Sequence, residues 1–190
     1  SLTSLDCSST HISTLPQMLP SSLLTYLDCS FTQLSSLPEI LPHSLKYLDV
    51  GNTRITTLPP TLPATLTVLR VSCTSIRSLP APLPPRLTQL DCDDTFVKNL
   101  PSPLPKKLTH LDLCDSPTTS IPQPLPDTLS YLNLHRSYIT TLPQSLPKSL
   151  VHLDISYSMQ IGTLPPLPHI LHSLVCTSCP IHEQIGRAHV

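Results

Sequence analysis

The chain has 190 residues, with 24 prolines, only 3 glycines and no tryptophan, and charged residues make up 12% of it. Its 11 basic and 12 acidic residues form no basic stripe, which argues against nucleic-acid binding, and no apolar run reaches the roughly 18 residues of a membrane span. Hydrophobic residues, 39% of the chain, are spread evenly along it, and this distribution favours a continuous core over disorder.

A leucine motif repeats from one end of the chain to the other. Repeats start at Leu2, Leu24, Leu45, Leu66, Leu87, Leu108, Leu129, Leu150 and Leu171. The first spacing is 22 residues and every later one is 21, which makes eight full repeats and a partial ninth. Such a period is typical of a solenoid, in which one unit cannot bury its apolar face alone and neighbours stack to form the core.

Each repeat opens with L-x-x-L-x-apolar, as in the segment from Leu45 to Val50. Alternation around the second leucine predicts a short strand with leucine inward and its neighbours outward. Stacked repeats therefore predict a parallel β-sheet, with Cys7, Cys29 and Cys92 as small inward-facing apolar residues.

Two Leu-Pro or Ile-Pro steps close every full repeat, for example at Leu58-Pro59 and Leu62-Pro63, and they account for 16 of the 24 prolines. Proline fixes φ, lacks an N–H and biases the preceding residue away from the helical region. The return segment of each coil is therefore predicted to be extended or polyproline-like, with little helix. The sheet is then expected on the inner, concave face and the proline segments on the convex side.

This pattern resembles the leucine-rich-repeat family, and the paired Leu-Pro steps are most similar to its short bacterial-effector subtype. The resemblance implies a horseshoe-shaped solenoid. Some members of that subtype carry a ubiquitin-ligase domain after the repeats. The family usually has asparagine at the ninth position, whereas threonine or serine fills this column here, from Thr10 to Ser158, with Cys179 last. A hydroxyl can satisfy part of the same turn, so we expect a hydroxyl ladder with looser turns.

The array is predicted to cover residues 1–183, without a cap at either end. Residues 184–190 are interpreted as read-through of a sequencing adapter, because Ile185 to Val190 matches the translation of ATC GGA AGA GCA CAC GTC. Uncapped ends are expected to favour self-association.

The outward strand positions are the predicted partner-binding surface, because tyrosine is a frequent interface anchor and carboxylates suit a basic or polar polypeptide. The alternative is a solvated face kept polar for solubility. The candidate residues are Tyr26, Asp28, Tyr47, Asp49, Arg70, Asp91, His110, Asp112, Tyr131, Asn133, His152 and Asp154.

Two possible metal patterns are present but not favoured. Asp91, Asp93, Asp94, Asp112 and Asp115 could supply oxygen ligands to calcium, but no glycine-bearing calcium loop is present. His172-x3-Cys176-x2-Cys179-x2-His182 is similar to a zinc pattern, but the repeat register explains both cysteines. We therefore expect no metal and no cofactor.

The sequence favours a protein-protein interaction module that binds a protein or peptide, with a basic partner as one option. No G-x-S-x-G, H-E-x-x-H or glycine-rich phosphate loop is present, so no catalytic residue is predicted. Two alternatives remain: the targeting repeats of a larger secreted effector enzyme, such as a ubiquitin ligase, and a structural or surface-adhesion repeat protein. Because no flanking disulfide motif is present, a reducing compartment is modestly favoured, and secretion as an effector stays open.

Overall fold

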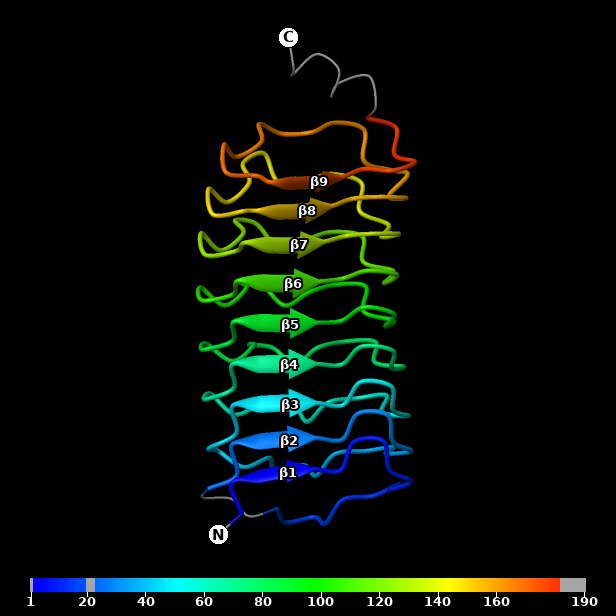
Figure 1. The fold of residues 1–190 in the computed structure, drawn as a ribbon, viewed down its shortest axis with the longest axis vertical. Coiled ribbons are helices and arrows are strands. Elements are labelled where there is room, and N and C mark those ends of the chain that lie inside the picture. Colours follow the sequence, from blue (N-terminus) through cyan, green and yellow to red (C-terminus); the bar gives the residue numbers. More distant parts are fainter. Residues whose placement is uncertain (1, 20–22, 182–190) are drawn as a thin grey trace.

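The computed structural model describes residues 2–19 and 23–181, so the interpretation of residues 184–190 lies outside the described part. The described residues form nine three-residue strands in one parallel sheet, ordered along the chain (Figure 1). The strands are β1 (Ser4–Asp6), β2 (Tyr26–Asp28), β3 (Tyr47–Asp49), β4 (Val68–Arg70), β5 (Gln89–Asp91), β6 (His110–Asp112), β7 (Tyr131–Asn133), β8 (His152–Asp154) and β9 (Ser173–Val175).

The sheet pairs each residue with its equivalent in the next repeat. Leu5 pairs with Leu27, and Leu90 pairs with Leu111, so the register follows the repeat length of 22 and then 21 residues. The ladder continues past the strand ends, where Cys29 N donates to Asp49 O and Phe31 N donates to Gly51 O, both at 2.9 Å. Each sequence position therefore becomes a vertical column of side chains, as the repeat predicted.

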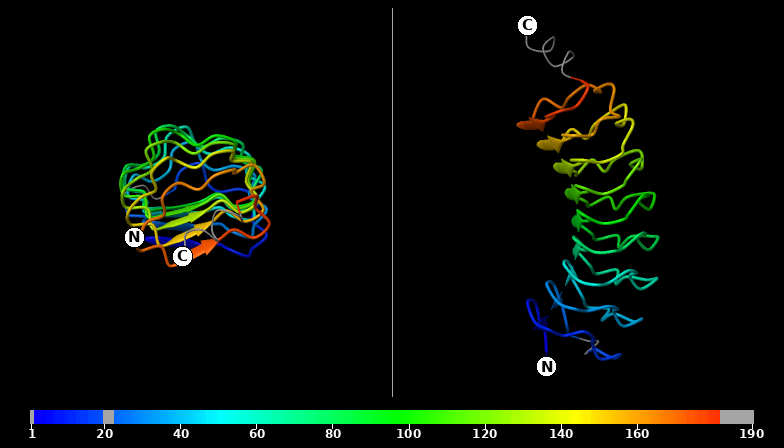
Figure 2. Two further views of the ribbon diagram at one scale, coloured as in Figure 1. Left: turned by 90° about the horizontal axis from the view of Figure 1, so that it is seen from above. Right: turned by 90° about the vertical axis from the view of Figure 1, so that its right-hand side faces the viewer.

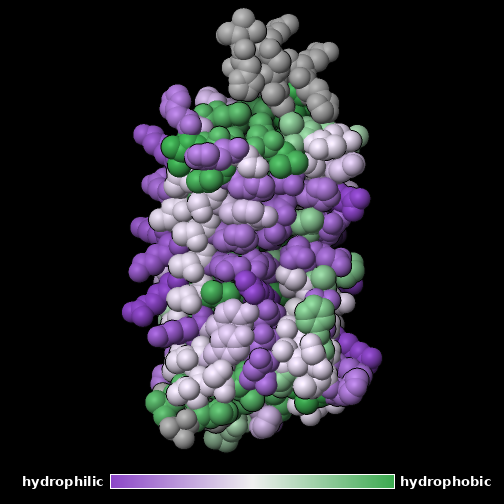
Figure 3. Space-filling model, viewed as in Figure 1, coloured by the Kyte–Doolittle hydropathy of each residue, from purple (hydrophilic) through white to green (hydrophobic). Residues whose placement is uncertain are grey.

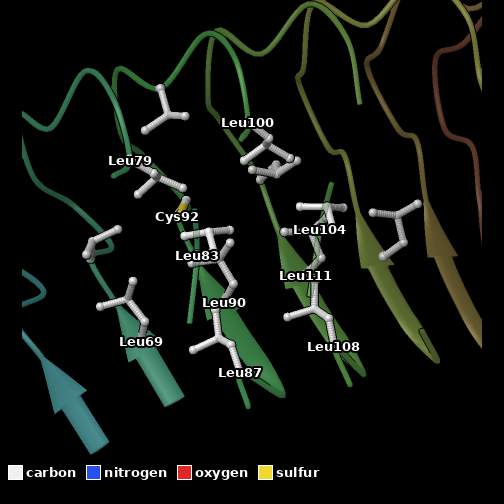
Figure 4. Packing of buried hydrophobic residues seen from close by; sticks show 14 of the residues in the cluster. Leu69, Leu79, Leu83, Leu87, Leu90, Cys92, Leu100, Leu104, Leu108 and Leu111 are labelled. Atoms are coloured by element: carbon white, nitrogen blue, oxygen red, sulfur yellow. The ribbon is translucent and has the colours of Figure 1, made fainter. Parts of the chain in front are cut away.

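The core lies between the sheet and the return segments. Leu90 and Leu111 point inward from β5 and β6, while Leu83 and Leu104 point back at them from the return segments (Figure 4). Leu90 and Leu111 are fully buried. At the array ends Leu2 is 45% exposed and Ile170 46% exposed, and apolar surface gathers there on the strand face (Figure 3).

The return segments are extended, and the described residues contain no helix. The array curves with its strands on the inner side and the proline segments on the outer side (Figure 2). A recurrent turn ends the return segments from the second repeat onward, as where Leu66 N donates to Pro63 O at 3.0 Å. The leucine-rich-repeat solenoid architecture with a concave parallel sheet is thus confirmed.

From β1 to β6, the hydroxyl column satisfies the turn after each strand. Thr53 Oγ1 donates to Val50 O at 2.7 Å, and Thr95 Oγ1 donates to Cys92 O at 2.7 Å. These bonds stay within one coil, whereas Ser158 Oγ donates to Leu134 O of the preceding coil at 2.6 Å and lies 3.1 Å from the Ser137 hydroxyl. The predicted hydroxyl ladder is therefore present, mainly as a column of caps that each serve their own turn.

The residue just before that hydroxyl adopts a left-handed conformation in every described repeat, with φ between 48° and 58°. This column contains no glycine and includes bulky residues such as Phe31, Arg136 and Tyr157. Left-handed φ costs an L-residue roughly 1–2 kcal/mol. The neighbouring coils and the cap must offset that cost.

Candidate interaction surface

The twelve predicted partner-binding residues lie on β2 to β8 and form two columns on the concave face. Asp49 is 9% exposed, and the others are half-buried. The ring column contains Tyr26, Tyr47, His110, Tyr131 and His152, and the acidic column contains Asp28, Asp49, Arg70, Asp91, Asp112, Asn133 and Asp154.

Tyr26 and Tyr47 form a stacked pair near the N-terminal end of the face. Their ring centroids are 4.4 Å apart and their planes differ by 9°. Each hydroxyl donates to an aspartate two residues ahead on its own strand, at 3.2 Å from Asp28 Oδ2 and Asp49 Oδ2 respectively. Burial, together with the Asp49 carboxylate, raises the pKa of Tyr47. Both rings are therefore held in one orientation, as neutral phenols.

A second stack of three rings covers β6 to β8. The His110 and Tyr131 ring centroids lie 4.0 Å apart with a 5° interplanar angle, and those of Tyr131 and His152 lie 4.7 Å apart with an 8° angle. Offset or parallel ring contacts add roughly 0.5–1.5 kcal/mol beyond their burial. Both faces of the Tyr131 ring are thus covered by imidazoles, and the three rings are held in one orientation on the concave face.

Arg70 connects Tyr47 of the first stack to Asp91, which in turn lies beside His110 of the second stack. Its Nε donates to Asp91 Oδ2 at 3.0 Å, and its Nη1 donates to the Tyr47 hydroxyl at 3.2 Å. The same nitrogen lies 3.9 Å from Asp49 Oδ2, and the guanidinium carbon lies 5.7 Å from the Tyr47 ring centroid. Because the Arg70 side chain is 40% exposed, solvent screens these ion pairs and limits their contribution to stability.

Several side chains of the acidic column also hydrogen-bond to the backbone, a role that the sequence analysis did not predict. One side-chain oxygen accepts the N–H two residues ahead, from Ser30 to Asp28 and from Gly51 to Asp49, both at 2.9 Å. Asn133 accepts the His135 N–H in the same way at 3.0 Å. The D-x-S or D-x-G spacing, a familiar turn signal, would have indicated this role. These carboxylates therefore have a structural function whether or not a partner binds.

Burial changes the titration of two of these aspartates. It raises the pKa of Asp49 against the opposing effect of the Gly51 N–H, and raises the pKa of Asp112 against the Cys114 N–H. Asp91 differs from its column neighbours, because its Oδ1 is buried without a hydrogen-bond partner and lies 3.5 Å from His110 Nε2. Asp91 is therefore held by Arg70 and by the Gln89 amide, which donates to Oδ2 at 2.9 Å, instead of by the turn.

The aspartates considered for calcium are mostly engaged elsewhere. Ser72 Oγ donates to Asp93 Oδ1, and Arg136 Nη1 lies 3.5 Å from Asp115 Oδ1. Of the residues considered for zinc, Cys179 donates its thiol to Cys176 O, while His172 Nδ1 lies 2.7 Å from Ile170 O. His182 lies outside the described residues. Neither set is brought together as three mutually close ligands within the part of the chain that the structure describes.

A different trio does meet on the turn edge beside the concave face. Ligand atoms of Cys114, Asp115 and His135 all lie within 4.8 Å of one another. Burial first, and then the Asp115 carboxylate, raise the pKa of the Cys114 thiol to about 12. Asp115 also lines a neighbouring groove of about 430 Å³, together with Arg136, Tyr138, Tyr157 and Met159.

Comparison with known proteins agrees with this architecture. The family model for the leucine-rich repeat matches residues 44–64. No curated protein matches the sequence. Among solved structures, YopM, a leucine-rich effector protein from Yersinia pestis, is 29% identical with a TM-score of 0.80. A leucine-rich-repeat protein of Leptospira interrogans is 24% identical with a TM-score of 0.81, which supports the fold alone.

Each of these alignments covers 94% of this chain, but only 55% of the YopM chain and 49% of the Leptospira chain. The chain thus spans about half the length of these structural neighbours. Within the described part of the chain, no helix is long and apolar enough to cross a membrane.

Proposed function

The chain is a leucine-rich-repeat protein with 21-residue repeats similar to those of bacterial effectors, and from this premise we propose that it binds a protein partner on its concave face. The observation that carries the proposal is the pair of ring stacks, Tyr26–Tyr47 and His110–Tyr131–His152, on one continuous sheet. Rings already stacked in the free protein lose little rotamer freedom on binding. Rigid aromatic side chains are frequent interface anchors for the same reason.

The charge beside the rings favours a basic or polar partner segment. The acidic column carries five aspartates among β2 to β8 and one arginine, Arg70, which is already paired with Asp91. Asp28 and Asp49 use one oxygen for the turn, and their second oxygen accepts the tyrosine hydroxyl; Asp28 is half-buried, whereas Asp49 is buried. A lysine or arginine of the partner can donate to the second oxygen of Asp28 without breaking the turn.

The proposal can be tested by selecting peptides from a displayed random library against the whole chain. We expect enriched peptides to be rich in lysine, arginine and aromatic residues. Replacing Tyr131→Ala together with His152→Ala should weaken their binding by about tenfold or more, as for hot-spot residues. Affinity would be measured by calorimetry and folding by urea unfolding.

A matched control is Gln144→Ala with Ser145→Ala, two exposed residues of a convex return segment. These changes should leave peptide affinity unaltered. The proposal fails if the control pair weakens binding while the Tyr131/His152 pair does not. Aspartate reversal is a poorer test, because Asp28 and Asp49 each accept a turn N–H.

A second candidate function is substrate targeting within a larger effector. It is supported by the likeness to YopM, which is described as an effector protein and of which this chain covers about half. Long-read sequencing of the parent locus through codon 183 distinguishes the two. A catalytic domain after the repeats would favour the effector enzyme, and a plain cap would favour a stand-alone binding protein.

A further inference from the structure

Three metal-ligating side chains of different chemistry meet where the chain leaves β6 and β7. Cys114 and His135 occupy the same column, 21 residues apart, and Asp115 follows Cys114. Cys114 Sγ lies 3.2 Å from Asp115 Oδ2, and the ligand atoms of all three residues lie within 4.8 Å of one another. Cys114 and His135 are half-buried and Asp115 is exposed, so solvent can reach the cluster.

Hydrogen bonds fix the backbone N–H groups of all three residues of the cluster. Asp112 Oδ1 accepts the Cys114 N–H at 3.0 Å, and Asn133 Oδ1 accepts the His135 N–H at 3.0 Å. Asp115 N donates to His135 O at 2.9 Å, which ties the two coils together. The relative position of the cysteine and histidine therefore follows from the parallel ladder.

The geometry points to a zinc site: we propose that Cys114, Asp115 and His135 bind Zn²⁺ through thiolate, carboxylate and imidazole, with water as the fourth ligand. Zinc favours S, N and O donors in tetrahedral geometry, with bonds of about 2.0–2.3 Å. Such bonds place neighbouring ligand atoms roughly 3.3–3.6 Å apart. The Cys114–Asp115 separation of 3.2 Å is slightly shorter than this spacing, and the farthest pair must close by about 1.5 Å at most to reach it.

Neighbouring side chains restrain the three ligands but leave their metal-binding atoms accessible. The His135 ring packs edge-on against Tyr157, with centroids 5.3 Å apart and a 66° angle, which restrains the imidazole. Arg136 lies 3.5 Å from Asp115 Oδ1, the carboxylate oxygen that does not contact the thiol. Its side chain is 59% exposed and can turn toward solvent, so the arginine does not block a cation at Oδ2.

The proposal is tested on the whole chain with Zn²⁺ by calorimetry and with Co²⁺ as a spectroscopic probe. We expect one ion per chain and a near-ultraviolet thiolate-to-Co²⁺ charge-transfer band. Cys114→Ser should abolish that band, and His135→Ala should weaken Zn²⁺ binding by about tenfold or more, because even the loss of a residue that only orients a ligand costs roughly 10–100-fold. Tetrahedral coordination of Co²⁺ would also give intense absorption in the visible spectrum.

Two cysteine variants serve as matched controls. Cys73→Ser changes another half-buried turn cysteine, and Cys176→Ser removes a member of the C-terminal His/Cys sequence pattern. Both should leave stoichiometry and spectrum unchanged. Absence of saturable one-to-one binding, or a charge-transfer band that persists in Cys114→Ser and disappears in Cys176→Ser, would overturn the proposal.

Discussion

The first and fifth coils carry the same Leu-Asp-Cys segment, yet their side chains have different surroundings. Leu90 and Cys92 on the fifth coil are completely buried, whereas Leu5 and Cys7 on the first are only half-buried. Thr95, at 3% exposed, likewise contrasts with the exposed Thr10. The local sequence cannot explain this, because it is the same in both coils.

We infer from this difference in burial that a coil is stabilised mostly by its neighbours. A middle coil packs on two others, while the first packs on one within the described chain. Full burial of a leucine contributes roughly 1.5–3 kcal/mol, so a half-buried one contributes less. Nearest-neighbour contacts of this kind are expected to dominate the stability of a solenoid.

The largest effect should come from the core leucines. Leu90→Ala is expected to lower the free energy of unfolding by about 2–5 kcal/mol, because it removes packing on both sides of a closed core. Leu5→Ala should cost clearly less. Urea unfolding of the two variants measures the difference, and equal losses would contradict the dominance of neighbour contacts.

An intermediate effect is expected from the hydroxyl column. Thr95→Val keeps the shape but leaves Cys92 O without its 2.7 Å donor, and should cost about 1–3 kcal/mol. Thr10→Val should cost less, since water can replace the bond to Cys7 O at the exposed end. If Thr95→Val proves neutral in thermal and urea unfolding, the column does not act as a set of buried caps.

The smallest expected effect is the change of stability with pH, which should have opposite signs for Asp49 inside the array and Asp6 on the first coil. Burial raises the pKa of Asp49, so its favourable contribution is complete below the unfolded pKa, near 3.9, and is lost as pH rises through the folded pKa. Hydrogen bonds from Ser8 lower the pKa of Asp6, whose contribution is present above the unfolded value and is lost as pH falls through the folded one.

Asp49→Asn and Asp6→Asn should therefore change stability with opposite slopes. The amide introduced by Asp49→Asn can still accept the Gly51 N–H, and the stability of this variant relative to the wild type should rise as pH increases from about 3 to 6. The Asp6→Asn variant should lose relative stability over the same range. Unfolding free energies measured at several pH values test this, and parallel slopes would contradict the burial difference.

Much of the fold could be predicted, because a 21-residue repeat forces equivalent residues into columns. The second leucines, from Leu27 to Leu153, are fully buried as expected, and the return segments are extended as their prolines predicted. Thr118 interrupts a column of isoleucine, leucine and valine, yet it is fully buried because its hydroxyl donates to Val97 O at 2.9 Å.

The candidate surface was predicted as a set of residues but not as a set of contacts. The period placed Tyr131 between His110 and His152, yet it carried no information on ring orientation, which depends on strand spacing and side-chain rotamers. The D-x-G spacing indicates that Asp49 accepts a turn N–H, but the period does not distinguish it from Asp91, which leaves one oxygen buried and unbonded.

The columns follow from the 21-residue repeat, which shows which residues recur, which alternate inward, and where proline forbids helix. Which columns touch, and how, depends on the stacking of the coils. Cys114 and His135 show why, since residues 21 apart become neighbours only when one coil stacks on the next. Periodicity acts along the chain, whereas ligand distances, ring stacking and burial arise between coils and depend on packing that no single repeat contains.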